Sequence, residues 1–72
     1  MAYDYSELKR KIAKKFGTQK KFAKAIGLSE RTVSLKLNNK IYFAQDEISK
    51  AAELLEIEDE EIREYFFIVK VQ

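Results

Sequence analysis

The stretch TQKKFAKAIGLSERTVSLKLNN, residues 18–39, contains the start and stop signals of two short helices. Thr18 is a preferred N-cap residue, and a helix over residues 19–26 places three apolar side chains on one face, namely Phe22, Ala23 and Ile26. Gly27 ends this helix because glycine reaches a positive φ without steric cost. The pattern therefore predicts a short helix followed by a tight turn.

A second helix follows the turn at once. Ser29 is its predicted N-cap, and Val33 and Leu37 lie one turn apart, so both face inward from a helix over about residues 30–38. Two helices joined by so short a turn cross steeply and need a small side chain where they touch, which Ala23 supplies. This is the geometry of a helix-turn-helix. The outer side of the second helix then carries Glu30, Arg31, Ser34 and Leu35.

The composition limits both the size of the protein and its chemistry. With 72 residues, 46% hydrophobic, we expect one domain over residues 1–72 and no deep pocket for a small molecule. The absence of cysteine and histidine removes disulfides, thiol chemistry and the commonest metal ligands, so no metal or cofactor is expected. No nucleophile with a base and no phosphate loop is visible, so we do not expect an enzyme.

The apolar runs are too short to cross a membrane, and the N-terminus has no apolar signal core. We therefore expect a soluble, cytoplasmic protein. The net charge of +2 conceals an asymmetry, because residues 1–40 carry a net +8 and residues 41–72 a net −6. A basic half of this kind favours a polyanion such as nucleic acid, although lysines that only solvate helix faces give the same count.

The central motif resembles the phage repressor and Cro type of DNA-binding domain. The resemblance rests on T-Q-x-x-F-A-x-x-I-G-L-S-x-x-T-V-S, which begins at Thr18 and ends at Ser34. The sequence departs from that pattern at Lys36, where the family commonly has an apolar residue, and at Asn39, where it commonly has glycine. The resemblance implies a lambda-repressor-like, all-α bundle of about five short helices and a Cro-like repressor that binds operator DNA as a double strand.

Roles at the DNA follow from position and from this resemblance. Arg31 is the expected base reader, through guanine O6 and N7, and Leu35 offers methyl contact to thymine. Glu30 accepts from cytosine N4 or stabilises the positive end of its helix. The expected DNA-binding set is Thr18, Gln19, Ser29, Glu30, Arg31, Thr32, Ser34, Leu35, Asn38 and Lys40.

The remaining helices are predicted from apolar spacing. A first helix, capped by Asp4 or Ser6 with Glu7 completing a capping box, buries a stripe made by Tyr5, Leu8, Ile12, Ala13 and Phe16. A fourth helix covers residues 45–55 and a short fifth helix residues 59–65. In the connector between the third and fourth helices, we expect Ile41 and Phe43 to be buried and Tyr42 to point outward, either as a surface aromatic residue or against a phosphate.

The C-terminal tail, residues 66–72, is more apolar than the charged segment before it. It either folds back onto the core or forms an interface for a second copy or a partner, through Phe66, Phe67, Val69 and Val71. The sequence is therefore consistent with two functions. The first is Cro-like operator binding by a homodimer, and the alternative is an antirepressor or modulator of repression that binds a phage repressor protein.

Overall fold

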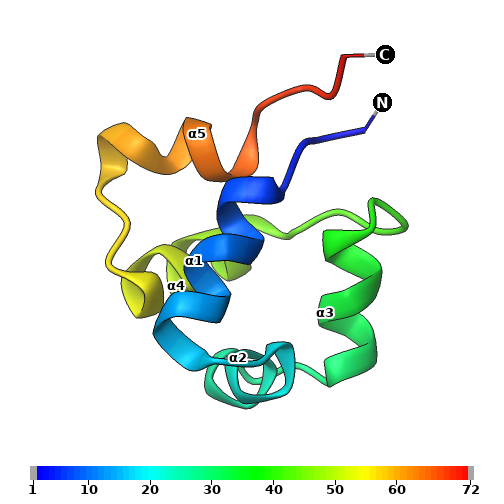
Figure 1. Cartoon of the computed structure of the whole chain (residues 1–72), viewed down its shortest axis with the longest axis vertical. Helices are drawn as coiled ribbons and strands as arrows, with labels where there is room; N and C mark the ends of the chain where they lie inside the picture. The colour runs from blue at the N-terminus through cyan, green and yellow to red at the C-terminus, as the bar shows by residue number, and fades with distance from the viewer. Residues whose placement is uncertain (1, 72) are drawn as a thin grey trace.

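The computed structural model describes residues 2–71, so Met1 of the predicted domain and Gln72 of the predicted tail lie outside the described residues. Within that range the protein is a compact all-α bundle with five α-helices and one 3₁₀ turn (Figure 1). This confirms the predicted fold class. The elements are α1 (Ser6–Phe16), α2 (Gln19–Ile26), α3 (Glu30–Leu37), α4 (Gln45–Leu55), η1 (Asp59–Glu61) and α5 (Ile62–Phe66).

The predicted ends of α2 and α3 are confirmed, together with their caps. The Thr18 hydroxyl accepts a hydrogen bond from the Lys21 N–H at 3.1 Å, and the Ser29 hydroxyl accepts one from the Thr32 N–H at 3.0 Å. Gly27 closes α2 in the left-handed conformation with φ 83°. Each helix end thus has a local cause within the stretch that predicted it.

The first helix begins differently from the prediction, because its N-cap residue is Tyr5 and not Asp4 or Ser6, and Tyr5 makes no side-chain capping hydrogen bond. The Asp4 carboxylate accepts from the Ser6 N–H at 2.9 Å, but the Asp4 N–H donates to the Ile68 carbonyl at 2.7 Å, so no capping box with Glu7 forms. The hydrogen bonds from Ser6 lower the pKa of Asp4 below its ordinary value. Ala13 is exposed and does not belong to the buried stripe, because the neighbouring elements leave that side of α1 open to solvent.

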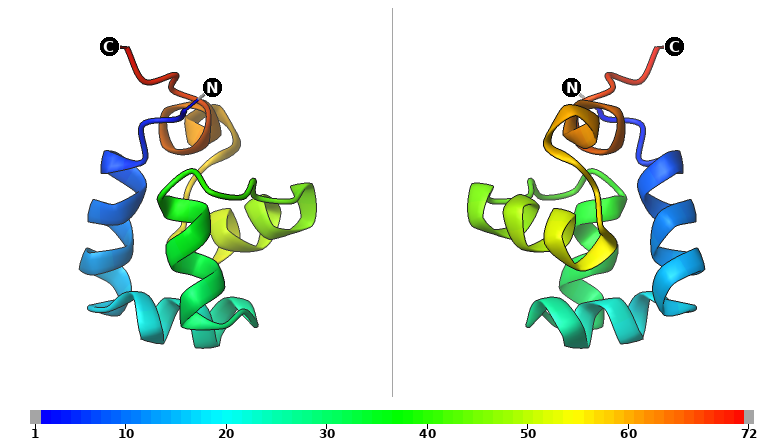
Figure 2. Two further views of the ribbon diagram at one scale, coloured as in Figure 1. Left: turned by 90° about the vertical axis from the view of Figure 1, so that its right-hand side faces the viewer. Right: turned by 90° about the vertical axis from the view of Figure 1, so that its left-hand side faces the viewer.

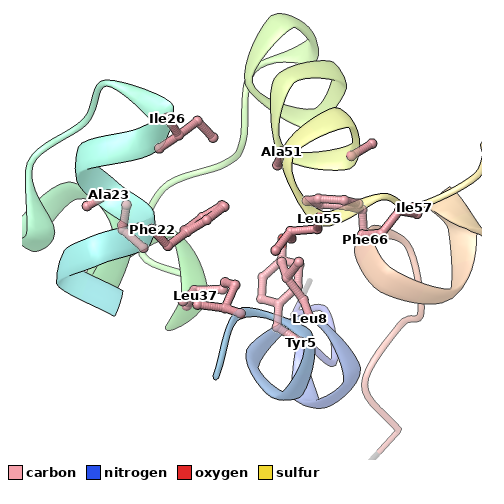
Figure 3. Close-up of a cluster of buried hydrophobic side chains, with 13 residues drawn as sticks. Tyr5, Leu8, Phe22, Ala23, Ile26, Leu37, Ala51, Leu55, Ile57 and Phe66 are labelled. Carbon is pink, nitrogen blue, oxygen red and sulfur yellow. The ribbon is translucent and has the colours of Figure 1, made fainter. Parts of the chain in front are cut away.

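The core lies where all five α-helices meet, with Val33 and Leu37 of α3 buried as predicted, and Figure 3 shows side chains converging there. Leu8, Phe22 and Leu55 are fully buried, and Phe66 is almost so. Ala23 of α2 is also buried, and α2 packs against α3. Within residues 2–71, no helix is long and apolar enough to span a membrane.

The two ends of the chain lie side by side at one end of the bundle (Figures 1 and 2). Tyr3 and Val69 form an isolated antiparallel bridge, and the Lys70 N–H donates to the Ala2 carbonyl at 2.9 Å. Phe66 is buried, so the tail does fold back onto the core there. After Phe66 the tail is exposed, so an interface through Phe67, Val69 and Val71 stays a prediction.

The connector between α3 and α4 confirms two of three expectations. Phe43 packs against the core and Tyr42 points outward, with 70% of its surface exposed. Ile41 is 43% exposed, so its predicted burial is wrong. The reason is that the chain turns at Asn39 with a positive φ of 62°, and the residues after it do not alternate as a strand would.

Candidate protein and nucleic-acid interfaces

The outer side of α3 is the first candidate surface, here called the reading face and defined as Glu30, Arg31, Ser34 and Leu35. Glu30 and Arg31 are exposed, and Ser34 and Leu35 are half-buried. Among the described residues, neither Glu30 nor Arg31 forms an ion pair. The structure therefore brings together, on one helix, the four side chains that the sequence placed there.

Several other residues of the predicted DNA-binding set use their side chains in hydrogen bonds at the two ends of α3. The Ser29 hydroxyl donates to the Thr32 hydroxyl at 2.8 Å, in addition to capping α3. The Asn38 side-chain amide donates to the Ser34 carbonyl at 2.8 Å. Because these groups already satisfy backbone atoms or one another, they support the shape of α3 whether or not a ligand is bound.

A broad, open depression lies beside the first turn of α3. It encloses about 710 Å³ and is lined by Thr18, Lys20, Lys21, Ala23, Lys24, Leu28 and Glu30. Thr18 and Glu30 both line this depression, whereas Gln19 is half-buried and does not. Lys40 is exposed beyond the other end of α3, where its N–H donates to the Leu35 carbonyl at 2.9 Å. The lysines give the depression a positive rim.

Lys36, on α3, is buried and forms an ion pair that no sequence signal predicted. Its ammonium lies 2.8 Å from the Glu47 carboxylate and donates to the Tyr42 carbonyl at 2.8 Å. Burial raises the pKa of Glu47, but hydrogen bonds from Lys36 and from the Ala44 N–H outweigh it, so this pKa lies below its ordinary value. A buried ammonium needs such partners, and here they connect α3 to α4.

Asn39, the second departure from the repressor pattern, joins the end of α3 to the N-terminus. Its side-chain oxygen accepts from the Tyr3 N–H at 2.8 Å, and its amide donates to the Tyr3 carbonyl at 2.9 Å. Asn39 also adopts φ 62°, a left-handed conformation in which glycine is the usual residue and asparagine is tolerated. Asparagine therefore keeps the turn and adds two hydrogen bonds that glycine lacks.

The second candidate surface is an aromatic groove of about 280 Å³, lined by Tyr3, Tyr5, Tyr42, Phe43, Ile48, Phe66 and Phe67. Its rings touch in a chain of edge-to-face or tilted pairs, including Tyr3 with Phe67 at 6.1 Å and Phe43 with Phe66 at 5.4 Å between centroids. Such geometry is favourable for aromatic pairs. Burial raises the pKa of the Tyr5 hydroxyl above its ordinary value.

The exposed part of the tail begins at Phe67, which lines this groove. Phe67 is 44% exposed, Val69 47% and Val71 91%, and Val69 lies opposite Tyr3 in the bridge. Of the four tail residues predicted to form an interface, Phe66 is buried and the other three reach the surface. Five groove residues were not predicted as part of an interface, because they come from separate segments of the chain: Tyr3, Tyr5, Tyr42, Phe43 and Ile48. The available signal was the excess of aromatic residues near both ends and after α3.

Fold and surfaces together define a small all-α protein with a helix-turn-helix unit and an exposed aromatic groove. The chain belongs to the family described as "Protein of unknown function (DUF739)", whose model matches residues 1–68. It is similar to a solved solution structure, that of the modulator of repression (MOR) of the temperate bacteriophage TP901-1 from Lactococcus lactis. The identity is 57%, the match covers 100% of this chain and 97% of that one, and the TM-score is 0.82. A comparison with curated proteins finds no match.

Proposed function

We propose that this protein is a modulator of repression that binds a phage repressor protein and thereby changes the action of that repressor at its operator. The observation that carries the proposal is the 57% identity to the TP901-1 modulator across nearly the full length of both chains. The proposal replaces Cro-like operator binding as the first reading. A repressor binds its operator in the cytoplasm of the bacterial host. The proposal therefore implies that this protein is cytoplasmic too.

The aromatic groove and the exposed tail support a protein partner. Tyr42, Phe67 and Val71 expose apolar surface that a chain with no partner has reason to bury. Aromatic residues are enriched at protein interfaces, and tyrosine is common among the residues that dominate binding energy. We therefore assign the groove and the tail as the surface that contacts the repressor.

The reading face supports DNA binding less strongly. Glu30 brings an exposed carboxylate to the end of α3 that would enter the major groove, where it would be repelled by phosphates. Ser29, Thr32 and Asn38 are already engaged in capping the same helix. Arg31 is then the main free base-reading group on this surface, which is a small set for specific recognition.

The test is a calorimetric titration of the full chain into the purified repressor encoded beside its gene. We expect a saturable complex with defined stoichiometry. In a gel shift, the same concentrations should change the complex that the repressor forms with its operator. Absence of any complex at micromolar concentrations of both proteins, with the repressor shown to bind its operator, would reject the proposal.

Cro-like operator binding is the second candidate, and a specific observation favours it. Residues 1–40 carry a net +8, and three lysines, Lys20, Lys21 and Lys24, line the depression beside the first turn of α3. A gel shift of the chain alone, on its own intergenic DNA with nonspecific competitor and a salt series, tests this candidate. A specific footprint that is lost in Arg31→Ala would support it, and uniform, salt-sensitive binding would count against it.

A further inference from the structure

Two polar side chains at the end of α3 hold the backbone segments that form the aromatic groove. The Lys36 ammonium donates to the Tyr42 carbonyl at 2.8 Å and lies 5.7 Å from the centre of the Phe43 ring. Its partner Glu47 accepts from the Ala44 N–H at 2.8 Å. Three successive residues of the connector are therefore tied to one ion pair.

Asn39 holds the N-terminal segment, which forms the other wall of the groove. Its side chain exchanges two hydrogen bonds with the backbone of Tyr3, at 2.8 and 2.9 Å, although the two residues are far apart in the sequence. Tyr3 in turn packs edge-on against Phe67. The connector wall is thus fastened to the last turn of α3, through Lys36, and the N-terminal wall to the turn directly after it, through Asn39.

We infer that Lys36 and Asn39 are positioning residues for partner binding, because they hold the groove open in the shape that the repressor meets. The inference rests on the proposed function. A groove that is already ordered avoids the entropy cost of ordering its side chains and backbone when the partner binds. The partner contacts the rings, while Lys36 and Asn39 act through the segments that carry those rings.

Apolar burial alone does not fix these segments. Tyr42 is 70% exposed and Ile41 43% exposed, and the connector has no helical hydrogen bonds of its own between Ile41 and Ala44. Few buried contacts and an irregular backbone are the usual marks of a mobile segment. Polar anchors at Tyr42 and Ala44 restrict that movement where the groove needs it.

The first test variant combines Lys36→Met with Glu47→Gln. Methionine fills the space of the lysine stem, and glutamine still accepts from the Ala44 N–H, so no unpaired charge is left inside. We expect about tenfold weaker binding to the repressor, with a retained helical circular dichroism spectrum. Lys14→Met is the matched control, because it removes one exposed lysine charge on α1, and it should bind within about twofold of the wild type.

The second variant is Asn39→Gly, which keeps the turn because glycine accepts φ 62°. It removes only the two bonds to Tyr3, so it remains informative if the first variant folds poorly. We expect about fivefold weaker binding to the repressor. Unchanged affinity in both variants would overturn the inference.

A double-mutant cycle with Tyr42→Ala separates positioning from general destabilisation. If Lys36 acts through the connector, the loss caused by Lys36→Met with Glu47→Gln should shrink severalfold when Tyr42 is already truncated. Equal losses in both backgrounds would overturn the inference. If the wild type binds the repressor but Tyr42→Ala binds equally well, the groove is not the contact surface and the inference fails while the proposed function stands.

Amide hydrogen exchange gives a readout that needs no partner. The Ala44 amide, which donates to Glu47 at 2.8 Å, should exchange severalfold faster in the first variant, with the amides of α1 unchanged. If the wild type binds no repressor, the proposed function fails. The exchange measurement still tests whether the Lys36–Glu47 ion pair holds the connector in place. Unchanged exchange in the connector would overturn the positioning role.

Discussion

The reading face of α3 and the aromatic groove at the end of that helix differ in how they are assembled. The reading face and its caps come from one continuous stretch, residues 29–38, and several of its polar groups are bonded to their own helix. The groove is assembled from the N-terminus, the connector, α4 and the end of the chain. A surface made from one stretch is visible in sequence, whereas a surface made from four segments appears only when the chain folds.

The sharpest way to test the division between core and groove uses two neighbouring phenylalanines. Phe66→Ala removes a ring that is 2% exposed, so it should lower the free energy of unfolding by about 3–5 kcal/mol, close to the whole stability of a small domain. Phe67→Ala removes a ring that is 44% exposed and should cost less than about 1.5 kcal/mol. Urea unfolding followed by circular dichroism measures both. Similar losses would mean that Phe67 belongs to the core and is unavailable to a partner.

The next prediction compares the two surfaces directly in repressor binding. Tyr42→Ala truncates an exposed groove residue and should weaken binding by about 30-fold, which is about 2 kcal/mol. Arg31→Ala on the reading face should change it less than about threefold. Calorimetric titrations with the repressor give both values. The reverse order would transfer the contact to the reading face and would contradict our assignment of the groove.

A smaller effect is expected within the helix-turn-helix. Ser29→Ala removes the cap of α3 and should lower the free energy of unfolding by about 1 kcal/mol, whereas Leu35→Ala on the half-buried outer side should cost less than the 2–5 kcal/mol of a core leucine. Thermal unfolding measures both changes. If Ser29→Ala leaves the free energy of unfolding unchanged, the Ser29 hydroxyl is not needed as a cap and is available to a ligand. The reading face would then differ less from the groove than we infer.

The sequence predicted the helices because their signals are local. Thr18, Ser29 and Gly27 act within one turn of where they stand, so their roles need no knowledge of the rest of the chain. The same holds for the apolar spacing that placed Phe22 and Leu55 in the core. These features survive folding unchanged because no distant residue competes with them.

The groove could not be predicted in the same way. From sequence alone, Lys36 is expected at the surface, because its partners, Glu47 and the Tyr42 carbonyl, lie in later segments. Ile41 is expected in the core, but the turn at Asn39 directs it to the surface. Tyr3 has no local signal for its bonds to Asn39. In each case the deciding partner is supplied by another segment, so the residue type alone indicates the wrong surroundings or none.

The smallest predicted effect is a loss of stability in acid that involves the groove but not the reading face. It is absent near neutral pH, where the Glu47 carboxylate is ionised. The pKa of Glu47 lies below its ordinary value of 4.5 in the folded protein, because the bonds from Lys36 and Ala44 outweigh its burial. A lowered pKa means that the carboxylate contributes stability above the ordinary value and that this contribution is lost as the pH falls through the folded-state pKa.

Urea unfolding at a series of pH values should therefore show a loss of stability in acid that is smaller in the variant combining Lys36→Met with Glu47→Gln. Asp4 and Glu56 also have lowered pKa values, and both remain in that variant, so the difference between the two curves isolates the ion pair. The protection factor of the Ala44 amide in the connector should fall at the same pH, while the α3 amides bonded within the reading face keep their protection. Parallel curves for the two proteins would mean that the Lys36–Glu47 pair contributes nothing to holding the groove.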